Sequence, residues 1–63
     1  MRLGEILDLI GFHKIYVIDN SDVDGDVLFA GLNIAMPPEM RRYQVKAMFA
    51  YDSALFIDVV VPE

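Results

Sequence analysis

Residues 44–61 read QVKAMFAYDSALFIDVVV, and this stretch decides the fold. It contains two runs that are rich in β-branched and aromatic residues, separated by Asp52 and Ser53, a pair typical of tight turns. The first run shows a two-residue alternation of Val45, Ala47, Phe49 and Tyr51. The stretch therefore predicts two strands, at residues 44–51 and 54–61, that form a hairpin.

A competing interpretation makes residues 38–51 one helix, because Met40, Gln44 and Met48 are acceptable helix formers. The alternation and the turn at residues 52–53 favour a strand instead. On that interpretation Pro37 and Pro38 introduce a single helical turn that ends near residue 42.

The segments upstream repeat the hairpin pattern. Residues 13–19 are rich in β-branched and aromatic side chains and predict a strand, residues 20–25 are turn material, and residues 26–31 predict a second strand. Residues 32–36 fit either a continuation of that strand or an irregular connection. We therefore expect a second hairpin with a longer, acidic loop.

The first segment, residues 2–10, predicts a short amphipathic helix. Its apolar residues recur at helical spacing, namely Leu3, Ile6, Leu7 and Ile10. Gly11 is placed to end the helix, since glycine readily adopts the left-handed conformation found after a helix C-terminus. A helix of two to three turns is too short to persist alone in water, so it must pack on the sheet.

Together these elements predict an α+β fold in the order α-β-β-turn-β-β. A short N-terminal helix packs on a small antiparallel sheet of three to four strands, within a single domain of residues 1–63. One helix cannot cover the whole sheet, and the strands are apolar on both faces. Tyr16 and Ile18 lie opposite Ile15 and Val17, for example. We therefore expect self-association, with a second copy covering the open face or an exposed edge strand.

Composition excludes several classes of protein. The chain has 63 residues, no cysteine, and five basic against ten acidic side chains, for a formal net charge of −5. A disulfide framework, a thiolate zinc site and a cysteine nucleophile are therefore excluded, and the reducing cytosol is the natural compartment. The acidic balance argues against direct nucleic-acid binding. No apolar run approaches the roughly 18–20 residues of a spanning helix, so we expect a cytoplasmic protein that does not bind membranes.

The acidic loop has the sharpest local motif. Asn20, Asp22, Asp24 and Asp26 alternate around Gly25, which resembles the first half of a calcium-binding loop. The second half fails, because the position expected for a bidentate glutamate is Gly31. The ordinary interpretation is a hairpin loop, whose turns favour Asp, Asn and Gly. A second interpretation makes Asp22, Asp24 and Asp26 an acidic patch that mimics phosphates and blocks a nucleic-acid-binding protein.

No set of residues converges on catalysis. His13 is the only histidine. Only Ser21 and Ser53 offer a hydroxyl nucleophile, and both lie in predicted turns. We expect no enzyme activity, no catalytic residue, no cofactor and no firm metal site. Arginine and tyrosine are frequent anchors of protein interfaces. The predicted partner-binding residues are Arg42, Tyr43, Tyr51 and Phe56.

Several segments together carry a resemblance to a known group. They are Leu3-x-Glu5-Ile6-Leu7-x-Leu9-Ile10, Tyr16-Val17-Ile18-Asp19, Leu28-Phe29-x-Gly31, Met36-Pro37-Pro38-Glu39 and Leu55-x-Ile57-x-Val59. This pattern resembles small acidic uncharacterised proteins of gut Firmicutes and their phages or mobile elements. The resemblance implies a cytoplasmic accessory protein and brings no activity or cofactor with it. The leading hypothesis is a non-enzymatic protein-interaction module that forms homo-oligomers and binds an unknown protein partner.

Overall fold

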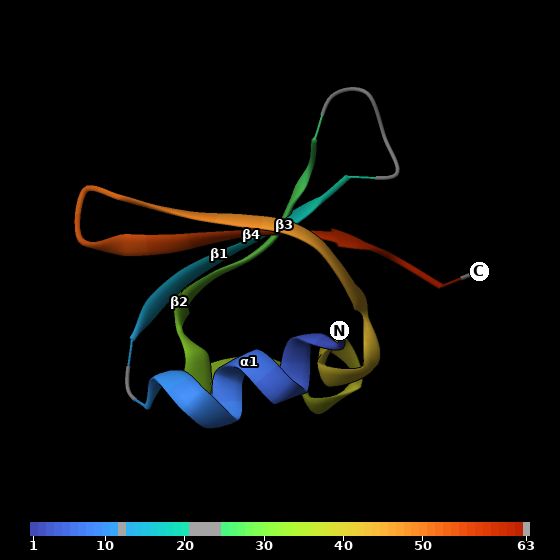
Figure 1. Cartoon of the computed structure of the whole chain (residues 1–63), viewed down its shortest axis with the longest axis horizontal. Coiled ribbons are helices and arrows are strands. Elements are labelled where there is room, and N and C mark those ends of the chain that lie inside the picture. The colour runs from blue at the N-terminus through green and yellow to red at the C-terminus, as the bar shows by residue number, and fades with distance from the viewer. Residues whose placement is uncertain (12, 21–24, 63) are drawn as a thin grey trace.

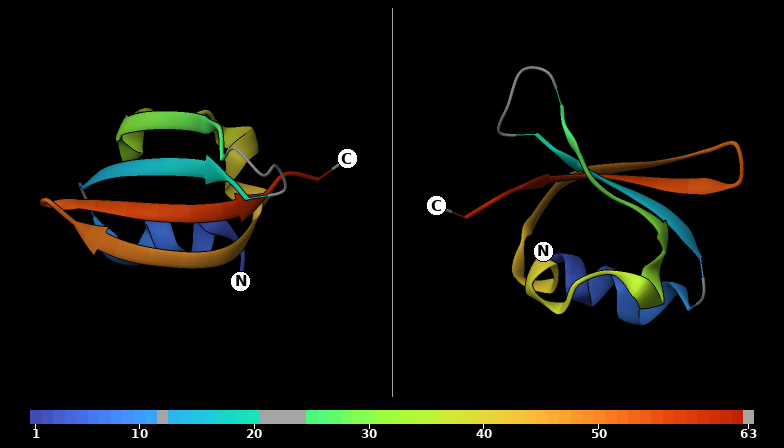
Figure 2. Two further views of the ribbon diagram at one scale, coloured as in Figure 1. Left: turned by 90° about the horizontal axis from the view of Figure 1, so that it is seen from above. Right: turned by 180° about the vertical axis from the view of Figure 1, so that it is seen from behind.

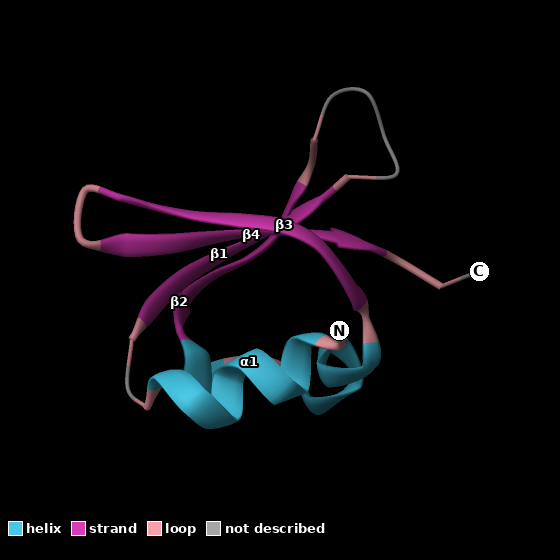
Figure 3. Cartoon of the chain, viewed as in Figure 1, coloured by secondary structure: helices cyan, strands magenta, loops and turns pink. Residues whose placement is uncertain are grey.

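The computed structural model describes residues 1–11, 13–20 and 25–62. It is an α+β fold in which one N-terminal helix packs on a four-stranded sheet, as predicted (Figure 1). The elements in chain order are α1 (Leu3–Ile10), β1 (Lys14–Asp19), β2 (Val27–Leu32), the 3-10 turns η1 (Asn33–Ala35) and η2 (Pro38–Arg42), β3 (Gln44–Tyr51) and β4 (Ala54–Val60). Figure 3 shows the helical elements gathered on one side of the strands.

The sheet has the strand order β2-β1-β4-β3 and is mixed, so the prediction of an antiparallel sheet is wrong at its centre. Each hairpin is antiparallel, but β1 and β4 pair in parallel. The cause is the path of residues 33–43. Because β2 and β3 run in the same direction, this segment must return along the sheet before β3 begins, and a parallel arrangement needs such a crossover.

The core lies between α1 and one face of the sheet. Leu3, Ile6 and Leu7 are buried on the inner side of the helix, while Glu5 and Asp8 are exposed. They pack against the fully buried inner residues of the two central strands, which are Ile15, Val17, Ile57 and Val59. The prediction that Ile15 and Val17 share a face opposite Tyr16 is therefore confirmed.

The helix alternative for residues 38–51 is wrong, because this segment forms η2 followed by strand β3. The tight turn after β3 explains why residues 44–51 form a strand of a hairpin. Asp52 and Ser53 both adopt left-handed backbone angles, with φ of 52° and 62°. Two consecutive positive φ values give a hairpin turn whose twist matches that of the flanking strands.

Asn33 joins the crossover to the segment between α1 and β1. It is the buried polar residue of the described core, and its side-chain Nδ2 donates a hydrogen bond to the Gly11 carbonyl. Its Oδ1 accepts from the His13 backbone N–H at 3.1 Å, and its own N–H donates to the His13 carbonyl at 3.0 Å. These bonds hold the start of the crossover against the end of α1.

The far end of the crossover packs closely on the first turns of α1. A Cβ at Gly4 would lie 3.1 Å from three atoms of Arg41, including its carbonyl oxygen. The Arg41 guanidinium contacts the Asp8 carboxylate at 2.7 Å and the Gly4 carbonyl at 3.3 Å.

Over the part of the chain that the structure describes, no helix is long and apolar enough to cross a membrane.

Candidate interaction surface

The face of the sheet opposite α1 is open. In the views of Figure 2 the helix and the 3-10 turns all lie on the other side of the strands. Strand pairing and alternation place a largely apolar set of side chains on this open face: Val27, Ala30 and Leu32 of β2, Tyr16 and Ile18 of β1, Phe56 and Val60 of β4, and Ala47, Phe49 and Tyr51 of β3. We call this set the open face.

Three aromatic rings form a stacked row across the open face. Tyr16, Phe56 and Phe49 are direct neighbours in the register of β1, β4 and β3. The Tyr16 and Phe56 ring centroids are 4.6 Å apart at 13°, and those of Phe56 and Phe49 are 5.1 Å apart at 6°. Tyr51 adds an edge contact to Phe56 at 6.3 Å. The outer side chains remain exposed, with 53% of Phe49 and 68% of Tyr51 accessible to solvent.

The side chains of this row are preorganised for binding. Each stacked pair contributes about 0.5–1.5 kcal/mol beyond the area it buries, and the contacts restrict the rotamers of the rings. A partner therefore meets side chains that are already ordered, so less conformational entropy is lost when the complex forms. Contiguous exposed apolar surface of this kind marks interaction sites.

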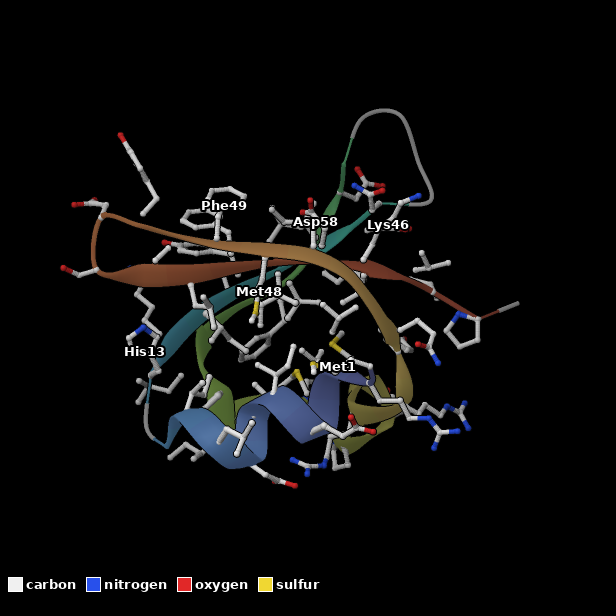
Figure 4. All side chains as sticks on the ribbon, viewed as in Figure 1. Met1, His13, Lys46, Met48, Phe49 and Asp58 are labelled. Atoms are coloured by element: carbon white, nitrogen blue, oxygen red, sulfur yellow. The ribbon has the colours of Figure 1, made fainter. Side chains whose placement is uncertain are left out.

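Charged side chains accompany the apolar ones. The Lys14 ammonium lies 5.4 Å from the centre of the Tyr16 ring, which supports a cation–π contact. Figure 4 shows Lys46, Phe49 and Asp58 rising from the open face, whereas Met48 projects toward the helix. The open face thus carries both signs of charge around its aromatic row.

The four predicted partner-binding residues do not share one surface. Tyr51 and Phe56 lie together on the open face, as the alternation allowed. Tyr43 is half-buried against the core, and its carbonyl accepts a hydrogen bond from the Leu3 N–H at 2.9 Å. Arg42 is exposed beside the N-terminal segment. Reasoning from the sequence missed Phe49 and Tyr16 as members of the site.

The residues of the acidic loop are described only in part. Asp22 and Asp24 lie outside the described residues, whereas Asn20 and Asp26 are exposed at its two ends. Among residues 1–11, 13–20 and 25–62, no three acidic, histidine or cysteine side chains gather as a metal site would require. The calcium interpretation of Asn20, Asp22, Asp24 and Asp26 stays a prediction, and so does the phosphate-mimicry interpretation of Asp22, Asp24 and Asp26.

A cleft opens where the N-terminal segment meets β3 and the end of β4. It has a volume of about 610 Å³ and is lined by Arg2, Arg42, Gln44, Val60 and Pro62. A shallower depression of about 340 Å³ lies on the helix side of the two arginines and includes Asp8 and Arg41. Nothing in the sequence indicated that Arg2 and Arg42 line one cleft, because they lie at distant positions in the chain.

Comparison with known proteins brings no relative. No protein-family model matches the chain, and no curated protein or solved structure matches it either. The resemblance to small acidic proteins of gut Firmicutes and their phages or mobile elements therefore stays a prediction.

Proposed function

We propose that the chain is a non-enzymatic protein-interaction module that associates with a second copy of itself through the open face. The observation that carries the proposal is the stacked, exposed row of Tyr16, Phe56 and Phe49 on a sheet face that no other described element covers. We place this module in the bacterial or phage-infected cytoplasm, because the chain has no cysteine and the resemblance in sequence is to such proteins.

The dimensions of the face favour a second copy as its occupant. Figure 1 views the sheet edge-on along the shortest axis, so the face extends along axes of 28 and 18 Å between Cα atoms. These extents belong to the whole chain, so their product of about 500 Å² is an upper limit on the footprint per copy, and it places the interface among small, weak ones. The sheet is twisted (Figure 1), and two sheets of the same twist can pack face to face about 10 Å apart, so a second copy suits this face.

Charge has two opposing effects on association with a second copy. In a two-fold arrangement, the lysines of one open face, Lys14 and Lys46, can approach Asp58 of the other copy. Against this, each copy carries a formal charge of −5, so the two repel at long range. Salt screens that repulsion over a Debye length of about 8–10 Å. We therefore expect a dimer of moderate affinity, with Kd in the micromolar range, that tightens as salt is added.

The test compares two neighbours in β3. Phe49 and Met48 have nearly equal exposure, 53% and 51%, but project from opposite faces of the sheet (Figure 4). Phe49→Thr and Met48→Thr both introduce threonine, a β-branched residue that suits a strand. Sedimentation velocity from about 1 to about 500 µM spans the affinity expected of a small interface.

We expect the wild type and Met48→Thr to dimerise and Phe49→Thr to remain monomeric, with Kd raised at least about tenfold, a loss of 1.4 kcal/mol or more. Circular dichroism checks that both variants are folded. A wild type that is monomeric at the highest concentration refutes self-association, and an equal effect of both substitutions refutes the open face as its site.

A further inference from the structure

The cleft beside the N-terminal segment is built by a short extension of the sheet. Arg2 pairs with Gln44 in an isolated antiparallel bridge, which is flanked by backbone bonds from the Leu3 N–H to the Tyr43 carbonyl at 2.9 Å and from the Val45 N–H to the Met1 carbonyl at 2.8 Å. In such a ladder, residues directly opposite and diagonal to one another share a face. Gln44 thus shares a face with Arg2, and Arg42, the last residue of η2, lines the same cleft beside them.

The two arginines are not neutralised within the described chain. Arg41, their neighbour, pairs with Asp8 at 2.7 Å, whereas no described acidic side chain forms an ion pair with Arg2 or Arg42. Within the described residues, the donors of both guanidinium groups are therefore available to an external oxyanion.

We propose that this cleft binds a doubly charged oxyanion, a phosphate monoester attached to a small apolar group. Two guanidinium groups balance two negative charges, and the planar donor fork of arginine matches phosphate geometry. Val60 and Pro62 form the apolar wall that contacts the rest of the ligand. The volume of about 610 Å³ lies within the range of small-molecule sites.

The cleft adjoins the open face, because Val60 belongs to both, but the two sites use different chemistry. The open face presents stacked rings centred on Phe56, whereas the cleft presents arginine donors at the edge formed by the first residues of β3 and the end of β4. Phe49→Thr, which we expect to be monomeric, keeps every residue that lines the cleft, so it should still bind the phosphate monoester. Arg2→Gln and Arg42→Gln keep the stacked rings, so the dimer should still form. Failure of one proposal is thus distinguishable from failure of the other.

The experiment is a titration followed by ¹H–¹⁵N correlation NMR at constant ionic strength, with phenyl phosphate as probe. We expect saturable shifts of the Arg2 and Arg42 side-chain Nε–H signals and of the Gln44 backbone signal, with Kd near about 1 mM, as few contacts allow. Inorganic phosphate tests the apolar wall and binds several-fold more weakly. Benzoate carries a single charge on the same ring and also binds more weakly.

Arg42→Gln and Arg2→Gln should each raise the Kd for phenyl phosphate at least tenfold. Arg41→Gln is the matched control, because that guanidinium is held by Asp8 outside this cleft, and it should change Kd less than twofold. Absence of saturation up to about 20 mM phenyl phosphate, more than ten times the expected Kd, overturns the proposal. So does an equal effect of the three substitutions, or equal shifts at Lys14 and Lys46, because each indicates diffuse charge attraction.

Discussion

Asn33→Ala is expected to destabilise the protein by about 1–3 kcal/mol. The substitution removes two side-chain hydrogen bonds, one from the His13 N–H and one to the Gly11 carbonyl, each with a net value of about 0.5–1.5 kcal/mol. Only 9% of Asn33 is exposed, so water cannot fully replace the lost partner. The backbone bond from the Asn33 N–H to the His13 carbonyl survives, which keeps the loss within this range.

That loss is large for a chain of this size. At about 0.05–0.15 kcal/mol per residue, a 63-residue domain has a free energy of unfolding of roughly 3–9 kcal/mol. A loss of about 2 kcal/mol lowers Tm by about 8–16 °C, given the 4–8 °C per kcal/mol typical of small domains. The crossover is expected to loosen first, because Asn33 attaches its beginning to the end of α1.

Urea unfolding followed by far-UV circular dichroism measures the change, and an unchanged m-value shows that the same surface is exposed. The matched control is Ile34→Ala in the same 3-10 turn, where the side chain is exposed and the expected loss is below about 0.5 kcal/mol. Asn33→Asp keeps the acceptor for His13 but places a carboxylate oxygen against the Gly11 carbonyl, so it should destabilise at least as much as alanine. If Asn33→Ala and Ile34→Ala have equal effects, the hydrogen bonds at Asn33 do not hold the crossover.

Three further predictions concern packing, the turn and charge. Gly4→Leu lowers the free energy of unfolding by about 1–3 kcal/mol in urea melts, because its Cβ would meet Arg41 at 3.1 Å, whereas Glu5→Leu on the exposed side changes it little. Asp52→Asn combined with Ser53→Gly raises thermal stability by about 0.5–1 kcal/mol, since both positions have positive φ; a lower Tm would contradict this account of the turn. Raising NaCl from about 0.05 to about 0.5 M tightens the dimer in sedimentation experiments, and weakening would contradict the proposed balance between apolar contact and net charge.

Local periodicity made most of the elements predictable. The helical spacing of Leu3, Ile6 and Leu7, and the alternation of Ile15 with Tyr16, each report which side of an element is buried. The structure places these side chains as that rule requires. Turn chemistry was equally informative at Asp52, because only a few residue types tolerate its positive φ.

The parallel pairing of β1 with β4 could not be predicted in this way. Both a simple meander and the observed order satisfy the same alternation, and the choice between them depends on the path of residues 33–43. That path is held by tertiary contacts of two residues with little local signal. Asn33 reads as an ordinary polar residue of a connection, and Gly4 reads as a weak helix position, until their partners are known.

The composition of the open face depends on one extra residue in β3. Val45 pairs with Val59 on the core side, but Ala47 pairs with Asp58 on the open side, so Lys46 is a bulge that shifts the alternation. Val45 and Phe49 are separated by an even number of positions, so their side chains would share a face in a regular strand. The bulge separates them, so that Val45 packs on the core while Phe49 stacks on Phe56.

Without the bulge, either Val45 would leave the core or Phe49 would move to the helix side of the sheet, since a one-residue shift exchanges the two faces. Deletion of Lys46 should therefore destabilise the fold and abolish the aromatic row together, whereas Lys46→Ala, which retains the extra residue, should preserve both.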